Sequence, residues 1–173
     1  MRWIDMSCVL ECTEVTSKCI RVMLNGISSE LRSKYDHKLD AKNRIAVPSE
    51  WRPSEGCCLL LLKSSRKLLP MIKALTHEKF QEYIETIHSM SYNPAQKDML
   101  IGKLHSDCVE TTVNAQGKML IPKKMCELSK LGTDVKLVGR GGYFEIWKPE
   151  LYDEVELLEA AELEELNAEL GIF

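Results

Sequence analysis

The sequence LDAKNRIAVP at residues 39–48 returns 74 residues later as VNAQGKMLIP at residues 113–122. Asn and Gly are among the residues that best tolerate a positive φ, so their occurrence at one position of both copies predicts the same tight turn twice. The chain therefore contains an internal repeat. Its matching positions are Asp40/Asn114, Ala41/Ala115, Asn43/Gly117, Arg44/Lys118 and Pro48/Pro122.

The residues around each turn predict a short strand on either side of it. Tyr35, His37 and Leu39 alternate with polar residues, which is typical of a half-exposed strand before the first turn. Strands are also expected at residues 45–47 and 119–121, so each copy predicts a hairpin over 39–47 or 113–121. Pro48 and Pro122 suit the first turn of a helix, the second of which should stop at Gly132.

Further elements follow each copy. Residues 59–71 and 135–147 each predict a hairpin; the GRGG of the second resembles a phosphate-binding loop but lacks the Lys-Ser/Thr and the following helix that such a loop needs. Two helices are expected between the copies. Thr76 can cap the first, with Phe80, Ile84 and Ile87 as its apolar stripe, and Asn93-Pro94 begins the second, with Met99, Leu100 and Leu104 on its inner face. A last helix should run from Pro149 to near Gly171.

The repeat also predicts how the copies pack. A unit of about 45 residues is too small to bury a good core alone, so the simplest arrangement packs the two copies on each other about a pseudo-two-fold axis. The expected fold is a β-rich α+β protein in which the halves complete one β-barrel with accessory helices.

Several motifs in order resemble the MraZ family of bacterial transcriptional regulators: YDHKLDAKNRIAVPSEWR at 35–52, the Asn-Pro start at 93, NAQGKMLIP at 114–122 and VKLVGRGGYFEIW at 135–147. The resemblance covers residues 33–152 and implies two tandem SpoVT-AbrB (AbrB-type) swapped-hairpin modules, at 33–79 and 109–152. A weakly ordered extension (1–32), a helical connector (80–108) and an acidic C-terminal helix (153–173) complete the expected organisation. The resemblance further implies a DNA-binding, repressor-type regulator of a cell-division and cell-wall gene cluster, assembled as a ring of identical subunits.

The motif that matters in MraZ-like proteins is Asp-x-x-x-Arg, once per module. The first copy keeps it as Asp40 and Arg44, whereas the second has Asn114 and Lys118, which retains the positive charge but loses the guanidinium fork. The first module is therefore expected to dominate sequence readout. The expected DNA-binding residues are Asp40, Lys42, Asn43, Arg44, Asn114, Gln116, Gly117 and Lys118. The alternative is that Asp40 and Arg44 only pair with each other across the turn.

Charge is divided unevenly along the chain. Residues 1–149 carry 23 basic and 17 acidic side chains, a net charge of +6, while nine acidic and no basic residues follow from Glu150 onward. A phosphate-facing band around the two turns is therefore possible despite the overall net charge of -3. Its candidates are Lys38, Lys42, Arg44, Lys118, Lys123 and Lys124. The acidic end is interpreted as a solvated helix face, with phosphate mimicry or partner docking as alternatives.

Other classes of function find little support. Seven cysteines without regular spacing do not predict disulfides, and Cys8 and Cys12 with Cys19 or His37 fit no zinc pattern. Neither Cys57, Cys58 and Cys108 nor the histidines 37, 77, 88 and 105 lie in a nucleophile motif, so no enzyme, cofactor or small-molecule substrate is predicted. Acidic residues at 5, 11 and 14 and the lack of a long apolar run predict a cytoplasmic protein. The resemblance to DNA-binding regulators implies that it is also nucleoid-associated. The rival hypothesis is an antitoxin-like AbrB module that binds a protein through its acidic, leucine-bearing C-terminal helix.

Overall fold

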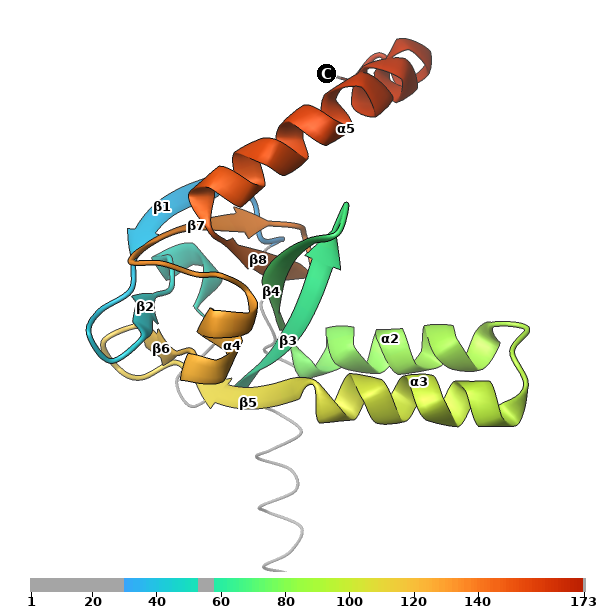
Figure 1. The fold of residues 1–173 in the computed structure, drawn as a ribbon, viewed down its shortest axis with the longest axis horizontal. Helices are drawn as coiled ribbons and strands as arrows, with labels where there is room; N and C mark the ends of the chain where they lie inside the picture. Colours follow the sequence, from blue (N-terminus) through green and yellow to red (C-terminus); the bar gives the residue numbers. More distant parts are fainter. Residues whose placement is uncertain (1–29, 53–57, 173) are drawn as a thin grey trace, which may run out of the picture.

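The computed structural model describes residues 30–52 and 58–172, and its chain trace is shown in Figure 1. The predicted extension at 1–32 therefore lies almost wholly outside the described residues, as do Cys8, Cys12, Cys19 and Cys57. The fold is a β-rich α+β fold, as predicted. Its strands are β1 (Lys34–Lys38), β2 (Arg44–Ala46), β3 (Cys58–Arg66), β4 (Leu69–Leu75), β5 (Cys108–Thr112), β6 (Lys118–Leu120), β7 (Asp134–Gly139) and β8 (Tyr143–Trp147). Its helices are the 3-10 helix η1 (Ser49–Trp51) and the α-helices α2 (His77–Ser89), α3 (Pro94–Ser106), α4 (Lys123–Leu128) and α5 (Pro149–Leu170).

The strands form an antiparallel six-stranded sheet in the order β1-β7-β8-β4-β3-β5 and a separate pair, β2-β6. The predicted hairpins β3-β4 and β7-β8 are both present. The predicted hairpins of the two repeats close at their turns, through Asp40 N to Arg44 O and Asn114 N to Lys118 O, and Val113 forms an antiparallel bridge with Met119. Beyond the turns the expectation is wrong: β1 pairs with β7, β5 with β3, and β2 with β6. Each repeat thus lends strands to the other, because an antiparallel partner is available there along the whole strand.

The pairing pattern is the same from either edge of the sheet. The order β1-β7-β8 on one side corresponds to β5-β3-β4 on the other, and β8 and β4 meet in the middle. In the two-stranded pair, Ile45 lies opposite Met119, its own counterpart in the repeat. Both residues are fully buried, so each contributes its side chain to the core between the repeats.

The main core lies between the two sheets and includes residues from both repeats. Trp51, from η1 after the first turn, packs on Phe144 of β8 with ring centroids 5.3 Å apart. Ile45, Val47, Met119 and Ile121 are all buried, whereas Arg44, Ala46, Lys118 and Leu120 between them are partly or fully exposed. This period of two places the polar residues of β2 and β6 on the outer face.

Helices α2 and α3 form an antiparallel hairpin that projects from the body (Figure 1). The predicted caps are confirmed, since Thr76 Oγ1 accepts from Lys79 N and Asn93 and Gln96 form a capping box. The predicted inner face of α3 is partly wrong. Met99 is 66% exposed and Leu100 is also exposed, while Leu104 is half-buried. The hairpin projects from the body, and within the described chain α3 has no second packing surface on which these two side chains could be buried.

Helix α4 ends at Leu128, four residues before the predicted stop at Gly132. Lys130 adopts a positive φ of 54°, and Leu131 N donates to Cys126 O at 2.9 Å. These are the features of a Schellman C-cap, in which a lysine here takes the conformation that glycine usually supplies. The helix therefore ends through its own local hydrogen bonds, and Gly132 is not needed.

Helix α5 begins at Pro149, as predicted, and leaves the body after its first turns (Figure 1). Tyr152 and Val155 are buried against Trp147 and Met71, which fixes the start of the helix. Farther along, Arg66 of β3 bridges the buried Glu145 of β8 and Glu159 of α5, at 3.1 and 3.6 Å. The leucines of α5 beyond Val155 stay exposed within the described chain: Leu157, Leu158, Leu163, Leu166 and Leu170.

Candidate nucleic-acid interface

The two repeat turns have the same backbone structure. In the first, Asp40 N donates to Arg44 O and Asn43 N to Asp40 O, at 3.0 and 2.9 Å. The second repeats these bonds, from Asn114 N to Lys118 O and from Gly117 N to Asn114 O, at 2.9 and 2.8 Å. Positive φ values of 55° and 75° at positions 43 and 117 confirm the predicted conformation.

Each turn is also closed by the side chain of its first residue. Asp40 Oδ1 accepts from the backbone N–H groups two and four residues later, at 2.9 and 3.0 Å. Asn114 Oδ1 accepts from the corresponding N–H groups of Gln116 and Lys118 at 3.0 and 2.9 Å. A carboxylate and an amide oxygen can both accept these bonds, which explains why Asp and Asn alternate at this position of the repeat.

The pairing of β2 with β6 brings the two turns together. Val47 N donates to Gly117 O and Ile121 N donates to Asn43 O, both at 2.9 Å, so each repeat bonds to the turn of the other. Both turns therefore lie at one end of the body, beside the β2-β6 pair (Figure 1). Side chains 74 residues apart in the sequence become parts of one surface, which we call the turn face and define as residues 40–44, 114–118 and Arg52.

At the first turn, Asp40 holds Arg44 in a fixed orientation. Asp40 Oδ2 accepts from Arg44 Nε at 2.9 Å and lies 2.8 Å from Arg44 Nη2. The Arg44 backbone N–H, followed by its guanidinium, holds the pKa of Asp40 well below its usual range. One edge of the guanidinium is thus engaged by the carboxylate, and the Nη1–Nη2 end of the fork is left for another acceptor.

At the second turn, the lysine does not stay within its own repeat. Lys118 Nζ lies 3.6 Å from Asp40 Oδ2, so the first turn's carboxylate contacts the cations of both copies. Side-chain exposures of 36% for Arg44 and 37% for Lys118 show that both cations remain accessible to solvent. Asn114, Gln116 and Lys42 are exposed as well.

Arg52 is a member of the turn face that the repeat did not predict. Its Nε donates to Val47 O at 2.9 Å, and its guanidinium lies over the α-carbon of Gly117. A Cβ built on Gly117 would be 2.2 Å from Arg52 Cζ, so only glycine leaves room for this contact. The counterpart of Arg52 in the second repeat is Cys126, a buried helix residue, and the repeat therefore gave no signal for it.

The remaining lysines of the predicted band are more dispersed. Lys123 and Lys124 are exposed on α4, where Lys123 lies 3.8 Å from Glu127, and Lys38 lies 3.3 Å from Asp134. These ion pairs are exposed and bind their lysines weakly. The structure brings Arg44 and Lys118 together around Asp40 and leaves Lys38 in a separate pair.

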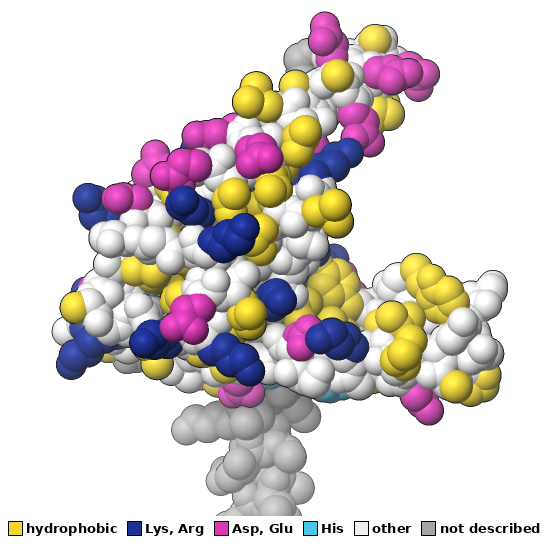
Figure 2. Space-filling model, in the orientation of Figure 1, with side chains coloured by type: hydrophobic (Ala, Val, Ile, Leu, Met, Phe, Trp, Pro, Cys, Tyr) yellow, Lys and Arg dark blue, Asp and Glu magenta, His cyan; other side chains and the backbone are white. Residues whose placement is uncertain are grey.

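The acidic helix α5 is separated from the turn face. Figure 2 shows acidic side chains gathered along α5 and Lys and Arg side chains over the body. Several of these acids pair with cations of the body, including Asp153 with Lys136 at 2.9 Å and Glu162 with Lys67 at 2.6 Å. The acidic face thus neutralises basic residues on its own side of the body, in addition to being solvated.

Other chemistry has no comparable arrangement in the described part of the chain. Burial raises the pKa of the Cys108 and Cys126 thiols, which opposes formation of a nucleophilic thiolate. No group of three His, Cys, Asp or Glu side chains within residues 30–52 and 58–172 is placed to hold a metal ion. None of the described helices is long and apolar enough to cross a membrane.

Comparison with known proteins gives related sequences but no matching family model. The transcriptional regulator MraZ of a Ruegeria species is 25% identical over 143 residues, covering 76% of this chain and 85% of the relative. The MraZ protein of Ureaplasma parvum is 24% identical, and the match covers 80% of this chain and 94% of the relative. The MraZ protein of Dictyoglomus thermophilum is 28% identical, and the match covers 70% of this chain and 81% of the relative. These relatives are named as regulators of transcription, not as enzymes.

Among solved structures, the solution structure of PHS018 from Pyrococcus horikoshii covers 66% of this chain and 95% of that chain. The identity is 12% and the TM-score is 0.33, too low to support a conclusion about a shared fold. Each of these sequence relatives matches 70% or more of this chain. The resemblance to the MraZ family of transcriptional regulators, first inferred from the motifs, is therefore confirmed over most of the chain.

Proposed function

We propose that this protein is a sequence-specific DNA-binding regulator of transcription that contacts DNA through the turn face. The observation that carries the proposal is the pairing of β2 with β6, which unites two identical backbone turns and their cations at one end of the body. Arg44 and Lys118 lie around a single carboxylate there, so the site keeps a net positive charge. Positive charge on one face is what phosphate contacts require.

The proposal includes the finer fold assignment. We assign residues 33–79 and 109–152 to two AbrB-type swapped-hairpin modules that close one pseudo-two-fold β-barrel, with 80–108 as the helical connector and 153–173 as the acidic end. The exchange of β1 and β5 between the repeats supports this assignment, because neither module then has a complete sheet of its own. The counterpart pairing of Ile45 with Met119 supports it too.

The two turns would take different parts in recognition. Arg44, oriented by Asp40, can offer its Nη1–Nη2 fork to the O6 and N7 acceptors of a guanine in the major groove. Lys118 is a point charge that contacts phosphate and carries no base geometry. In the opposing interpretation, Asp40 and Arg44 serve only to close the turn. Yet the Asp40 Oδ1 bonds to the backbone already close it, which leaves Oδ2 to orient the guanidinium.

A single turn face neutralises few phosphates, so the proposed regulator acts as a ring-like homo-oligomer on tandem sites, where each later contact forms at high effective concentration. By its family resemblance the target would be a cell-division and cell-wall gene cluster, repressed at the nucleoid. Light scattering at several concentrations tests the assembly. We expect a species well above a dimer, whereas a stable monomer throughout would contradict it.

The decisive experiment is a gel-shift titration with the duplex upstream of the protein's own gene and a scrambled duplex of equal length, at two salt concentrations. We expect tighter binding to the upstream duplex and weaker binding of both at the higher salt. The matched control is the double substitution Arg44→Ala with Lys118→Ala. Equal binding of wild type and double variant would contradict the turn face as the site, and no binding by wild type would contradict the function.

The exposed leucines of α5 favour a second candidate, an antitoxin-like module that binds a protein partner. Leu157 is 79% exposed and Leu170 is 64% exposed, on a helix that leaves the body. Two results together would favour this candidate over the regulator. One protein would copurify in stoichiometric amount and be lost in the double variant Leu163→Ser with Leu166→Ser, and the protein would fail to retain DNA at any salt concentration.

A further inference from the structure

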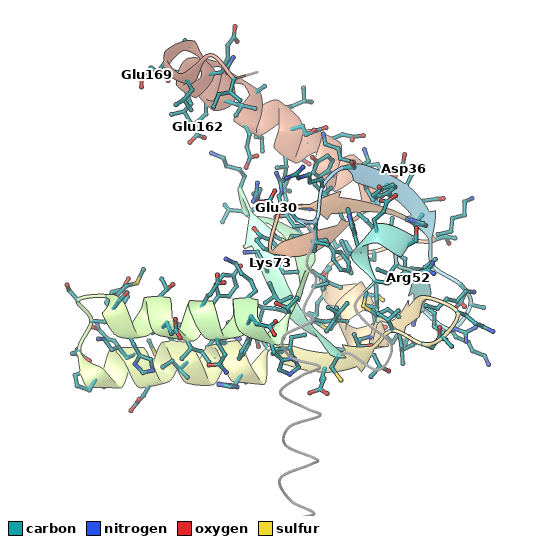
Figure 3. The ribbon with its side chains drawn as sticks, turned by 180° about the vertical axis from the view of Figure 1, so that it is seen from behind. Glu30, Asp36, Arg52, Lys73, Glu162 and Glu169 are labelled. Atoms are coloured by element: carbon teal, nitrogen blue, oxygen red, sulfur yellow. The ribbon has the colours of Figure 1, made fainter. Side chains whose placement is uncertain are left out.

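The second turn lacks the arginine of the first, but a guanidinium is present beside it. Arg52 comes from the first repeat, directly after η1, and reaches the Gly117 of the second turn. Its exposed side chain and the distal part of α5, marked by Glu162 and Glu169, lie on opposite sides of the molecule (Figure 3). These distal acids of α5 therefore do not neutralise it.

The anchoring of Arg52 parallels that of Arg44. Arg44 Nε donates to a carboxylate, Asp40, and Arg52 Nε donates to a backbone carbonyl, Val47 O, both at 2.9 Å. In both cases the Nε edge is held by the protein, which fixes the plane of the guanidinium. Arg52 makes no ion pair with a carboxylate among the described residues, whereas Arg44 and Lys118 share Asp40. Among the described residues, Arg52 thus contributes a positive charge to the turn face that no carboxylate neutralises.

We infer that Arg52 supplies in cis the guanidinium that the second repeat lost, and that it binds a pair of acceptor oxygen or nitrogen atoms on DNA beside the second turn. This inference rests on the proposed function and adds a binding residue to it. Gly117 has a corresponding role. Its missing side chain makes the space that the guanidinium occupies, while its positive φ suits the turn.

The acceptor pair can belong to a guanine edge or to a phosphate, and both are recognised by a planar fork of N–H donors. A lysine at position 52 keeps the charge and loses the fork. Comparing Arg52→Ala with Arg52→Lys therefore separates charge from geometry. The matched control is Arg32→Ala, which removes an equally charged, exposed side chain whose partner is Glu30, at the other end of β1.

The test is fluorescence anisotropy with the upstream duplex and a scrambled duplex at stepped salt, for wild type and the three variants, after thermal melts of each. We expect Arg52→Ala to weaken binding of the upstream duplex on the order of tenfold, Arg52→Lys to recover only part of the loss, and Arg32→Ala to change little. A larger loss on the upstream than on the scrambled duplex identifies a guanine edge, and an equal loss identifies a phosphate.

The outcomes separate the inference from the function on which it rests. If the wild type binds DNA and Arg52→Ala binds it equally well, the inference alone is overturned. Full recovery of binding by Arg52→Lys would also overturn it, because positive charge without a planar fork would then suffice. Should Arg52→Ala melt too low to assay, Arg52→Lys decides by the same criterion. Failure of wild type to bind either duplex would overturn the proposed function itself.

Discussion

The first turn, residues 40–44, and the second turn, residues 114–118, have the same hydrogen bonds but different charges. Corresponding bond lengths agree within about 0.1 Å, although an aspartate has become an asparagine and an arginine a lysine. The turn backbone therefore depends on a side-chain oxygen at the first position and a positive φ at the fourth. The comparison shows that charge at these turns can change without a change of backbone.

The charge difference has a structural consequence at the second turn. Asn114 offers no negative charge, and Lys118 lies beside Asp40 of the other repeat. Arg52 lies over Gly117, which has no side chain. The two turns form one electrostatic unit whose only described carboxylate is Asp40. Substitutions can break this unit or test the division of roles within it.

The largest expected effect comes from separating the two turns. Ile45→Ala removes a fully buried side chain opposite Met119 and should lower the free energy of unfolding by about 2 to 5 kcal/mol. Urea denaturation measures this. Leu120→Ala, in the same strand pair but 51% exposed, is the control and should change stability by less than about 0.5 kcal/mol. Equal effects would show that the β2-β6 pair is not a core element.

A second comparison concerns DNA binding by the two cations. Arg44→Ala should cost about 1 to 3 kcal/mol on the specific duplex and relax sequence preference, because an oriented fork is lost. Lys118→Ala should weaken binding to the specific and the scrambled duplex equally. It should also reduce the salt dependence of binding by about one phosphate contact per subunit. Competition binding at stepped salt measures both. If the two substitutions behave alike, the proposed division between the turns is wrong.

A third prediction compares the two positions of positive φ. Asn43→Ala should destabilise the fold by roughly 1 to 2 kcal/mol, the cost of a left-handed conformation for a residue with a Cβ. Gly117→Ala should cost more, because its Cβ would also displace the Arg52 guanidinium. Adding Arg52→Ala should recover that extra cost in a double-mutant cycle of urea denaturation curves. If the effects of the two substitutions on stability are strictly additive, the Arg52 guanidinium moves aside without a loss of stability.

The smallest effect concerns pH, because Asp40 and its partners are partly solvated. The folded-state pKa of Asp40 is lowered, so its ion pairs stabilise the fold above the unfolded pKa of about 3.9, and this stability is lost as pH falls through the lower folded value. Asp40→Asn keeps the turn but should remove this dependence. The stability difference between wild type and variant should shrink between about pH 5 and pH 2. Asn114→Asp would accept from the Lys118 backbone N–H as Asp40 accepts from that of Arg44, so this variant should gain the same pH dependence of stability. If it does not, the two turns are not equivalent.

The sequence was sufficient for features that depend on neighbouring residues. Asn43 and Gly117 placed both turns, Thr76 and Asn93 placed two helix starts, and the two later hairpins were predicted within a few residues. Two local details were wrong. Lys130 ended α4 before Gly132, because the Schellman hydrogen bonds outweighed the strain of a left-handed lysine, and Met99 and Leu100 were exposed because α3 meets only one neighbouring helix.

What the sequence by itself determined is the repeat, its turns and the change of charge between the copies, since these follow from residue types a few positions apart. Only the tertiary structure decided which strands pair. β1 and β5 pair with the opposite repeats, because strand pairing joins residues about a hundred or fifty positions apart and no local pattern encodes that choice. The pairing of β2 with β6 likewise placed Arg52 over Gly117 and Lys118 beside Asp40, so the composition of the turn face was settled by contacts between the repeats.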